Sequence, residues 1–174
     1  MAFNKTSRLQ KEMQRLQTRI QEAGGTEKFL ERDRWVLEPT SSLEVYNGTI
    51  LGAVDTPYEN QRYPLTISVE GVNYPHLPPK VVFSSVIPFH PNVFTNGNIC
   101  IDILKSDLSI SRWAPVMKFE DVMASLVSLL NDPNTDSPAN VDASKAFDQD
   151  QDKNKPNFAK MARQHYEKQL QKKN

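Results

Sequence analysis

The chemistry that this sequence could support centres on its only cysteine, Cys100, in the segment HPNVFTNGNICIDIL that begins at His90. Most free cysteines are buried and inert, so packing alone would account for a single one. Here the turn signal Asn96-Gly97-Asn98 stands just before Cys100, and prolines bracket the wider segment. This pattern predicts a shaped surface groove around the sulfur and makes Cys100 a candidate nucleophile.

The histidine nearest to Cys100 in the sequence is His90. If the two residues worked as in a cysteine peptidase, His90 would be the base that takes the proton from the sulfur. Because His90 directly precedes Pro91, its ring nitrogens could instead hold a turn in place. The periodicity of the residues does not separate these two roles.

A second candidate site is the acidic run FDQDQDKN, which imitates the start of a calcium-binding loop through Asp148, Asp150 and Asp152. Such a loop needs glycine at its sixth position and glutamate at its twelfth, where this chain has Lys153 and Ala159. We therefore expect a solvated acidic bend between two helices.

Neither a metal site nor a bound cofactor is predicted. The three histidines are far apart in the sequence and no second cysteine completes a zinc pattern. The six glycines form neither a dinucleotide fingerprint nor a phosphate-binding loop. The histidines are His76, His90 and His165.

The composition indicates which classes of partner and which cellular compartment to expect. The 174 residues include 21 basic and 21 acidic side chains, so no overall charge favours nucleic acid or an anionic membrane as a partner. No apolar run approaches the ~18 residues of a membrane span, and the charged N-terminal segment is unlike a signal peptide. A single cysteine also makes no internal disulfide, which favours the cytoplasm, the nucleus or both. We expect one domain over residues 1–174.

The elements that must position the cysteine can be predicted from periodicity. Residues 5–22 have an amphipathic helical pattern that ends at Gly24 and Gly25. Four β-branched and aromatic runs follow at 35–39, 42–54, 62–71 and 80–85, which predicts an antiparallel meander. Asn47-Gly48 is a hairpin-turn signal, and Pro64 suits the start of a strand.

The second half of the chain combines an irregular segment with helices. Residues 71–115 are rich in proline, and so long an ordered loop usually has a function. Helical spacing returns at 119–130 and ends at Asn131-Asp132-Pro133, with further helices expected near 141–147 and 157–171. The predicted fold class is α+β.

Several of these motifs together resemble the catalytic domain of ubiquitin-conjugating enzymes. The resemblance extends from about Arg8 to about Leu170 and includes the segments RLQKEM, DTPYE, YPHLPPKVVF and NFAKMARQHYEK. Its core is the tripeptide HPN at 90–92 with Cys100 after it, then WAP at 113–115 and LNDPN at 130–134. The family's fold, a four-stranded antiparallel sheet flanked by helices, agrees with the element order predicted above.

The resemblance implies acyl transfer by thioester exchange. Cys100 would accept the C-terminus of ubiquitin from an activating enzyme, which consumes the ATP, and would pass it to a lysine of a substrate protein. Asn92 would donate a hydrogen bond to the oxyanion, and donors of this kind are each worth ~3 kcal/mol in the transition state. By the same resemblance, His90 and Pro91 are structural residues that hold the turn.

On the side where lysine would approach, the resemblance assigns positions to Asp102, Asp136 and Ser137. Asp102 matches a family position near the site, and Asp136 adjoins Ser137, which matches the gate position held by aspartate or serine. A serine at this gate is a candidate for phosphorylation, because added charge beside a thioester would alter lysine binding. A serine that merely turns a loop is the simpler interpretation.

The resemblance also assigns partner surfaces. The positions expected to meet the activating enzyme and ubiquitin ligases come from the first helix and from two loops. They are Arg8 and Lys11 for the activating enzyme, and Pro75, His76, Ala114 and Pro115 for ligases. His76 departs from the apolar aromatic residue often found there, and residues 105–112 form a run about five residues longer than the shortest family versions.

Two alternatives remain within the same fold. The chain could conjugate another ubiquitin-like modifier, or it could be a scaffold that binds ubiquitin without catalysis. Relatives of the scaffold type characteristically lack the cysteine, so Cys100 argues against the second alternative.

Overall fold

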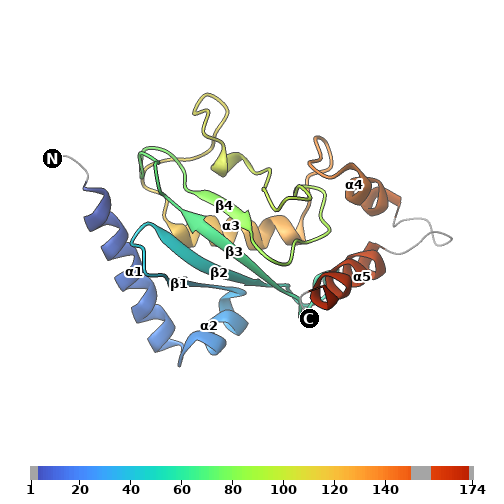
Figure 1. Cartoon of the computed structure of the whole chain (residues 1–174), viewed down its shortest axis with the longest axis horizontal. Helices are drawn as coiled ribbons and strands as arrows, with labels where there is room; N and C mark the ends of the chain where they lie inside the picture. Colours follow the sequence, from blue (N-terminus) through green and yellow to red (C-terminus); the bar gives the residue numbers. More distant parts are fainter. Residues whose placement is uncertain (1–3, 150–157, 173–174) are drawn as a thin grey trace.

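The computed structural model describes residues 4–149 and 158–172 as a four-stranded antiparallel sheet with helices around it (Figure 1). The strands β1 (Trp35–Pro39), β2 (Val45–Leu51), β3 (Arg62–Ser68) and β4 (Lys80–Phe83) lie in sequence order. The helices α1 (Lys5–Glu22) and α2 (Thr26–Asp33) lie at one end, and α4 (Val141–Asp148) and α5 (Phe158–Gln171) at the other. The predicted α+β meander is confirmed.

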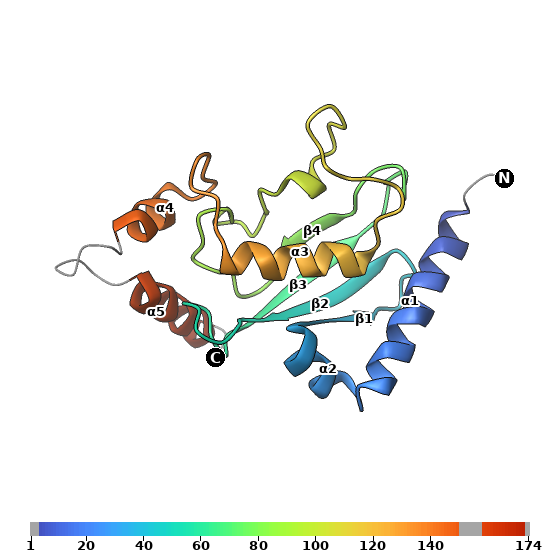
Figure 2. The same ribbon diagram turned by 180° about the vertical axis from the view of Figure 1, so that it is seen from behind.

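The core forms where the sheet meets the central helix α3 (Phe119–Asn131), which crosses one face of the sheet (Figure 2). The apolar side of α3 recurs every three or four residues, as a helix buried along one side requires. Its buried residues are Phe119, Val122, Met123, Leu126 and Leu130. All five belong to the hydrophobic core, so α3 is anchored along its length.

The helix α2 was not predicted from the sequence, in which Gly24 and Gly25 mark the end of the first helix. Gly25 begins α2 with φ 112, and the helix buries Phe29 and Leu30. Its end is formed by Arg34 in the left-handed region, with φ 66. Glycine or asparagine usually holds that position, so an arginine gave no recognisable stop signal.

The predicted hairpin turn at Asn47-Gly48 is wrong, because both residues lie in the middle of β2. Gly48 pairs with Leu37 on β1 and with Leu65 on β3. A Cβ at this position would lie 2.6 Å from Leu65 Cδ1 and 2.9 Å from Leu37 Cδ2. The glycine is thus required by two leucine side chains that cover it, and not by a turn.

Pro64 is the third residue of β3, where the sequence analysis preferred a strand start. Its carbonyl oxygen accepts a hydrogen bond from Ser84 N at 2.9 Å, so its ring nitrogen faces the same side, away from β2. The β3–β4 ladder begins only at Leu65, opposite Phe83. Because the nitrogen of Pro64 faces away from β2, its lack of an N–H removes no hydrogen bond between β2 and β3.

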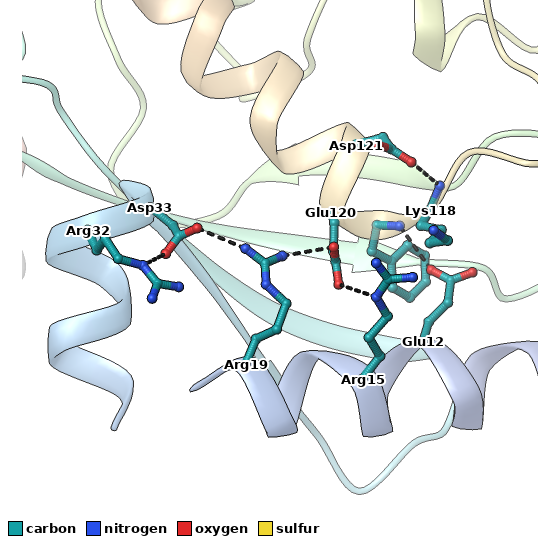
Figure 3. A network of polar contacts seen from close by, with 9 residues as sticks. Glu12, Arg15, Arg19, Arg32, Asp33, Lys118, Glu120 and Asp121 are labelled. Atoms are coloured by element: carbon teal, nitrogen blue, oxygen red, sulfur yellow. Dashed lines mark hydrogen bonds and ion pairs between the residues drawn. The ribbon is translucent and has the colours of Figure 1, made fainter. Parts of the chain in front are cut away.

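A network of ion pairs joins α1, α2 and α3 (Figure 3). Arg19 of α1 donates from Nη2 to Asp33 Oδ1 at 2.9 Å and from Nη1 to Glu120 Oε2 at 2.8 Å. Arg32 also reaches Asp33, with 2.7 Å between Nε and Oδ2. Since Asp33 ends α2 and Glu120 lies in the first turn of α3, Arg19 fixes both helices to α1.

The remaining predictions concern the second half of the chain. The helices expected near 141–147 and 157–171 are present as α4 and α5, while residue 157 lies outside the described residues. Of the acidic run, Asp148 ends α4 and Ala159 lies in α5, whereas Asp150, Asp152 and Lys153 fall outside the described residues. In the described ranges, no helix is long and apolar enough to cross a membrane, and no group of three acidic, histidine or cysteine side chains could hold a metal ion.

Candidate active site around Cys100

The loop that carries Cys100 is held by its own main chain and by β4. Cys100 N donates to Asn92 O at 2.8 Å, and Phe94 N donates to Asn98 O at 2.9 Å. Gly97, in the predicted turn, has φ 89 and accepts from Phe83 N of β4 at 3.0 Å. A Cβ on Gly97 would lie 2.2 Å from Phe83 O, so the turn can approach the strand only with glycine there.

His90 is fully buried and both of its ring nitrogens contact the main chain. Asn92 N donates to Nδ1 at 2.9 Å, which leaves Nε2 to donate to Leu129 O, also at 2.9 Å. Burial lowers the pKa of His90 to about 4, partly opposed by the Leu129 contact, so the ring is neutral at pH 7. This geometry supports a turn-holding role and leaves neither nitrogen to serve as a base for Cys100.

Asn92 joins the cysteine loop to the loop that follows α3. Its Nδ2 donates to Asn134 O at 2.7 Å and its Oδ1 accepts from Asn134 N at 2.8 Å. One residue earlier, Pro91 O accepts from Asn140 N at 2.9 Å. Asn92 is only 3% exposed, so its amide links the two loops inside the protein, in addition to its predicted role in the site.

A surface pocket of about 310 Å³ opens at Cys100, whose side chain is half-buried. A larger hollow of about 500 Å³ lies against β4, but Cys100 does not line it and we assign it no part in the chemistry. Four of the residues predicted for the site line the smaller pocket together, and two residues of the long loop join them. They are Cys100, Asn92, Asp102 and Ser137, with Lys105 and Arg112.

Asp102 begins the short helix η1 (Asp102–Leu104) and is held by two cations. Lys105 Nζ lies 2.6 Å from its Oδ1, and Arg112 Nε lies 3.7 Å from its Oδ2. The hydrogen bond from Lys105 lowers the pKa of Asp102, and the same bond raises the pKa of Lys105, with a further contribution from Cys100. The sequence indicates the long loop but not the role of these two side chains, since their contact with Asp102 depends on how the loop folds.

Asp136 does not line the pocket beside Ser137. Its main-chain N donates to Asn134 Oδ1 at 2.9 Å, and its side chain is exposed. The Asn134 side chain therefore stabilises the turn that carries Ser137, while Ser137 itself borders the sulfur pocket.

The residues predicted to meet partners differ in solvent exposure. Arg8 is tied inside the molecule, because it forms an ion pair with Glu12 and donates from Nη2 to Met117 O at 2.7 Å. Lys11 is exposed on α1. The two loops predicted to meet ligases are joined by a hydrogen bond from Trp113 Nε1 to Pro75 O at 2.8 Å. Around this bond His76 and Pro115 are exposed and Ala114 is half-buried.

Comparison with known proteins identifies the family to which the sequence is similar. The family model described as "Ubiquitin-conjugating enzyme" matches residues 8–166. A protein called "Ubiquitin-conjugating enzyme E2 2" from Fusarium solani is 42% identical over 127 residues, which cover 73% of this chain and 77% of the relative. Proteins of the same name from Trichoderma harzianum and Saccharomyces cerevisiae are 44% and 43% identical over 106 residues, or 61% of this chain.

The aligned segment covers 66% of the Trichoderma protein and 58% of the Saccharomyces protein, in each case less than two thirds of the relative's length. The family model, however, extends across most of this chain, from α1 into α5. The chain belongs to the ubiquitin-conjugating enzyme family.

Proposed function

We propose that this chain is a ubiquitin-conjugating enzyme that carries ubiquitin as a thioester on Cys100 and transfers it to a lysine of a substrate protein. The observation that carries the proposal is the pocket in which a half-buried sulfur lies together with Asn92, Asp102 and Ser137. Residues 1–174 would act as a single catalytic domain.

In the first step, the Cys100 thiolate attacks the carbonyl carbon of the thioester that links ubiquitin to the activating enzyme. A new C–S bond forms to Cys100, and the sulfur of the activating enzyme leaves as a thiolate. Because one thioester replaces another, the exchange is nearly isoenergetic and needs no strong base. A neutral, main-chain-bonded His90 is consistent with this chemistry.

In the second step, the lysine Nζ attacks the same carbonyl carbon, an amide bond forms and the C–S bond to Cys100 breaks. The attacking amine must first lose a proton, although a free lysine has a pKa near 10.4. A carboxylate beside the lysine's path favours its approach, and Asp102 is the candidate for this role. Asn92 Nδ2 donates one of its two hydrogens to Asn134 O, so the second can donate to the oxyanion.

The proposal requires partners but no bound cofactor. An activating enzyme would use ATP to charge Cys100, and a ubiquitin ligase would select the substrate. Exposed Lys11 is the stronger candidate for contact with the activating enzyme, because Arg8 is already engaged inside the molecule. Thioester chemistry needs a reduced sulfur, which favours the cytoplasm or the nucleus.

The proposal is tested by incubating the chain with activating enzyme, ATP and ubiquitin. We expect a product heavier by one ubiquitin that disappears with a thiol reductant and is absent in Cys100→Ala. Charging with a different ubiquitin-like modifier, but not with ubiquitin, would show that the modifier is misassigned. Failure to charge with any modifier would overturn the enzymatic proposal and favour the scaffold.

A second measurement addresses Asn92. We expect Asn92→Ala to be charged but to discharge slowly to free lysine, by up to about 100-fold if the full oxyanion contribution is lost. The variant also loses both contacts with Asn134, so its melting temperature must be measured in parallel. Discharge at the rate of the unmodified protein would remove the oxyanion role.

A further inference from the structure

Both ends of the long loop 105–112 are hydrogen-bonded to the same residue, Asp102. The main-chain carbonyl of Asp102 accepts from Lys105 N at 3.3 Å, from Arg112 N at 3.2 Å and from Ser111 Oγ at 3.1 Å. The loop leaves and rejoins the body of the protein at this carbonyl and projects from it (Figure 1). Its closure point is thus only two residues from the sulfur.

The loop is also ordered internally. Asp107 accepts from Ser109 N at 3.0 Å and from Ser109 Oγ at 2.6 Å, and Ser111 N donates to Asp107 O at 3.0 Å. Behind the loop, Trp113 N donates to Ser111 Oγ at 3.1 Å. These bonds define the path of the segment, so the positions of Lys105 and Arg112 at its two ends follow from the fold of the loop.

The two cations change the charge that an approaching lysine would meet. Asp102 is the one acidic side chain among the described residues that line the sulfur pocket, and Lys105 and Arg112 line it too. Lys105 Nζ lies 2.6 Å from Oδ1 of the carboxylate, about where the ammonium of a substrate lysine would pair with it. With one negative and two positive charges, this group repels a cationic acceptor.

We propose that the loop 105–112 restrains transfer to lysine, because Lys105 and Arg112 occupy the Asp102 carboxylate and disfavour a second ammonium beside Cys100. This inference rests on the proposed function and adds to it a control on the acceptor step. The restraint acts on charge, so it slows attack by lysine and spares attack by a neutral nucleophile.

The experiment measures discharge of chain preloaded with ubiquitin, in a single turnover after the activating enzyme has been stopped. Free lysine and hydroxylamine, which is largely uncharged at neutral pH, are compared as acceptors. Because exposed ion pairs are weak, we expect Lys105→Gln with Arg112→Gln to raise the rate with lysine about three- to tenfold. The rate with hydroxylamine should stay within about twofold, because an uncharged acceptor is not repelled by the two cations.

Three controls separate charge from structure. Lys105→Arg with Arg112→Lys keeps both cations and should discharge to lysine like the unmodified chain. Adding Asp102→Asn to the Gln variant should abolish the gain. Lys145→Gln with Lys160→Gln changes the net charge equally outside the pocket lining and should give no gain, which excludes a nonspecific charge effect.

Two outcomes would overturn the restraint while leaving the proposed function intact. One is normal charging with no gain toward lysine in the Lys105→Gln, Arg112→Gln variant. The other is an equal gain toward lysine and hydroxylamine, which would assign the loop to general access and not to charge. Absence of charging in the unmodified chain would instead overturn the proposed function, and the restraint with it.

Discussion

At the scale of single residues, His90 makes the stability of the protein depend on pH. Its pKa is about 4 in the folded state against 6.5 for an ordinary histidine, because burial disfavours the charged ring. Between these values the unfolded chain binds the proton more readily, so stability is lost as pH falls from 6.5 to 4. A shift of this size corresponds to about 3 kcal/mol lost across that interval.

The measurement is denaturant unfolding at several pH values for the unmodified chain and for His90→Asn. The variant should be less stable at pH 7, by about 2 kcal/mol, because the Leu129 contact and ring packing are lost. It should also lose less stability than the unmodified chain on acidification. His165, whose pKa is lowered as well, is present in both chains, so parallel pH curves would refute the assignment to His90.

At the scale of elements, Gly48 makes the packing of three strands possible. Its position is covered by Leu37 and Leu65, whose carbons lie within 2.9 Å of any added Cβ. We therefore expect Gly48→Ala to lower the free energy of unfolding by about 1–3 kcal/mol, because the two leucines must shift in a packed core. Asn47→Thr, at the adjacent exposed position of β2, is the matched control and should be neutral or slightly stabilising. Equal stability of Gly48→Ala and the unmodified chain would show that the leucines move freely.

A second prediction at this scale concerns Arg19, which joins α1 to α2 and α3 (Figure 3). Asp33 and Glu120 have side chains only 17% and 18% exposed, so Arg19→Gln leaves two carboxylates partly buried without this cation. Because these pairs are neither fully exposed nor fully buried, we expect the unfolding free energy to fall by about 1–3 kcal/mol, between the losses typical of the two classes. Arg15→Gln is the control, since Arg15 is 60% exposed and 4.0 Å from Glu120. Losses of the same size for both variants would contradict the bridging role.

The same scale shows how far the sequence could predict the structure. Amphipathic periodicity was sufficient for α1 and α3, because each helix buries one side, and β-branched and aromatic runs were sufficient for the meander. The turn signal was misleading at Asn47-Gly48, since a glycine required by leucines from two other strands has the same local sequence as a turn. For the candidate site, Cys100 and Asn92 could be predicted from their motif, and both line the same pocket. The contact of Lys105 with Asp102 could not, because it depends on how a loop of eight residues folds back.

At the scale of the whole molecule, the buried carboxylate of Glu12 connects segments far apart in the sequence. From α1 it pairs with Arg8, accepts from Tyr74 OH at 2.6 Å and accepts from Phe119 N at 2.9 Å, where α3 begins. Burial and the charge of Glu12 raise the pKa of Tyr74, so the phenol remains a donor throughout the physiological range. Tyr74 immediately precedes the predicted ligase loop, which Glu12 therefore supports from beneath.

This arrangement predicts a strong and non-additive response to mutation. Glu12→Ala should lower the unfolding free energy by about 3 kcal/mol or more, because Arg8, Tyr74 and the main chain at Phe119 lose a buried partner together. Replacing Glu12 and Arg8 by leucine in the same chain should cost less than the sum of the two single leucine variants, since neither charge is then left without the other. Urea unfolding of the four proteins in this cycle measures the coupling. Additive losses would mean that Arg8 and Glu12 stabilise the protein independently of each other, and that the ion pair between them does not contribute.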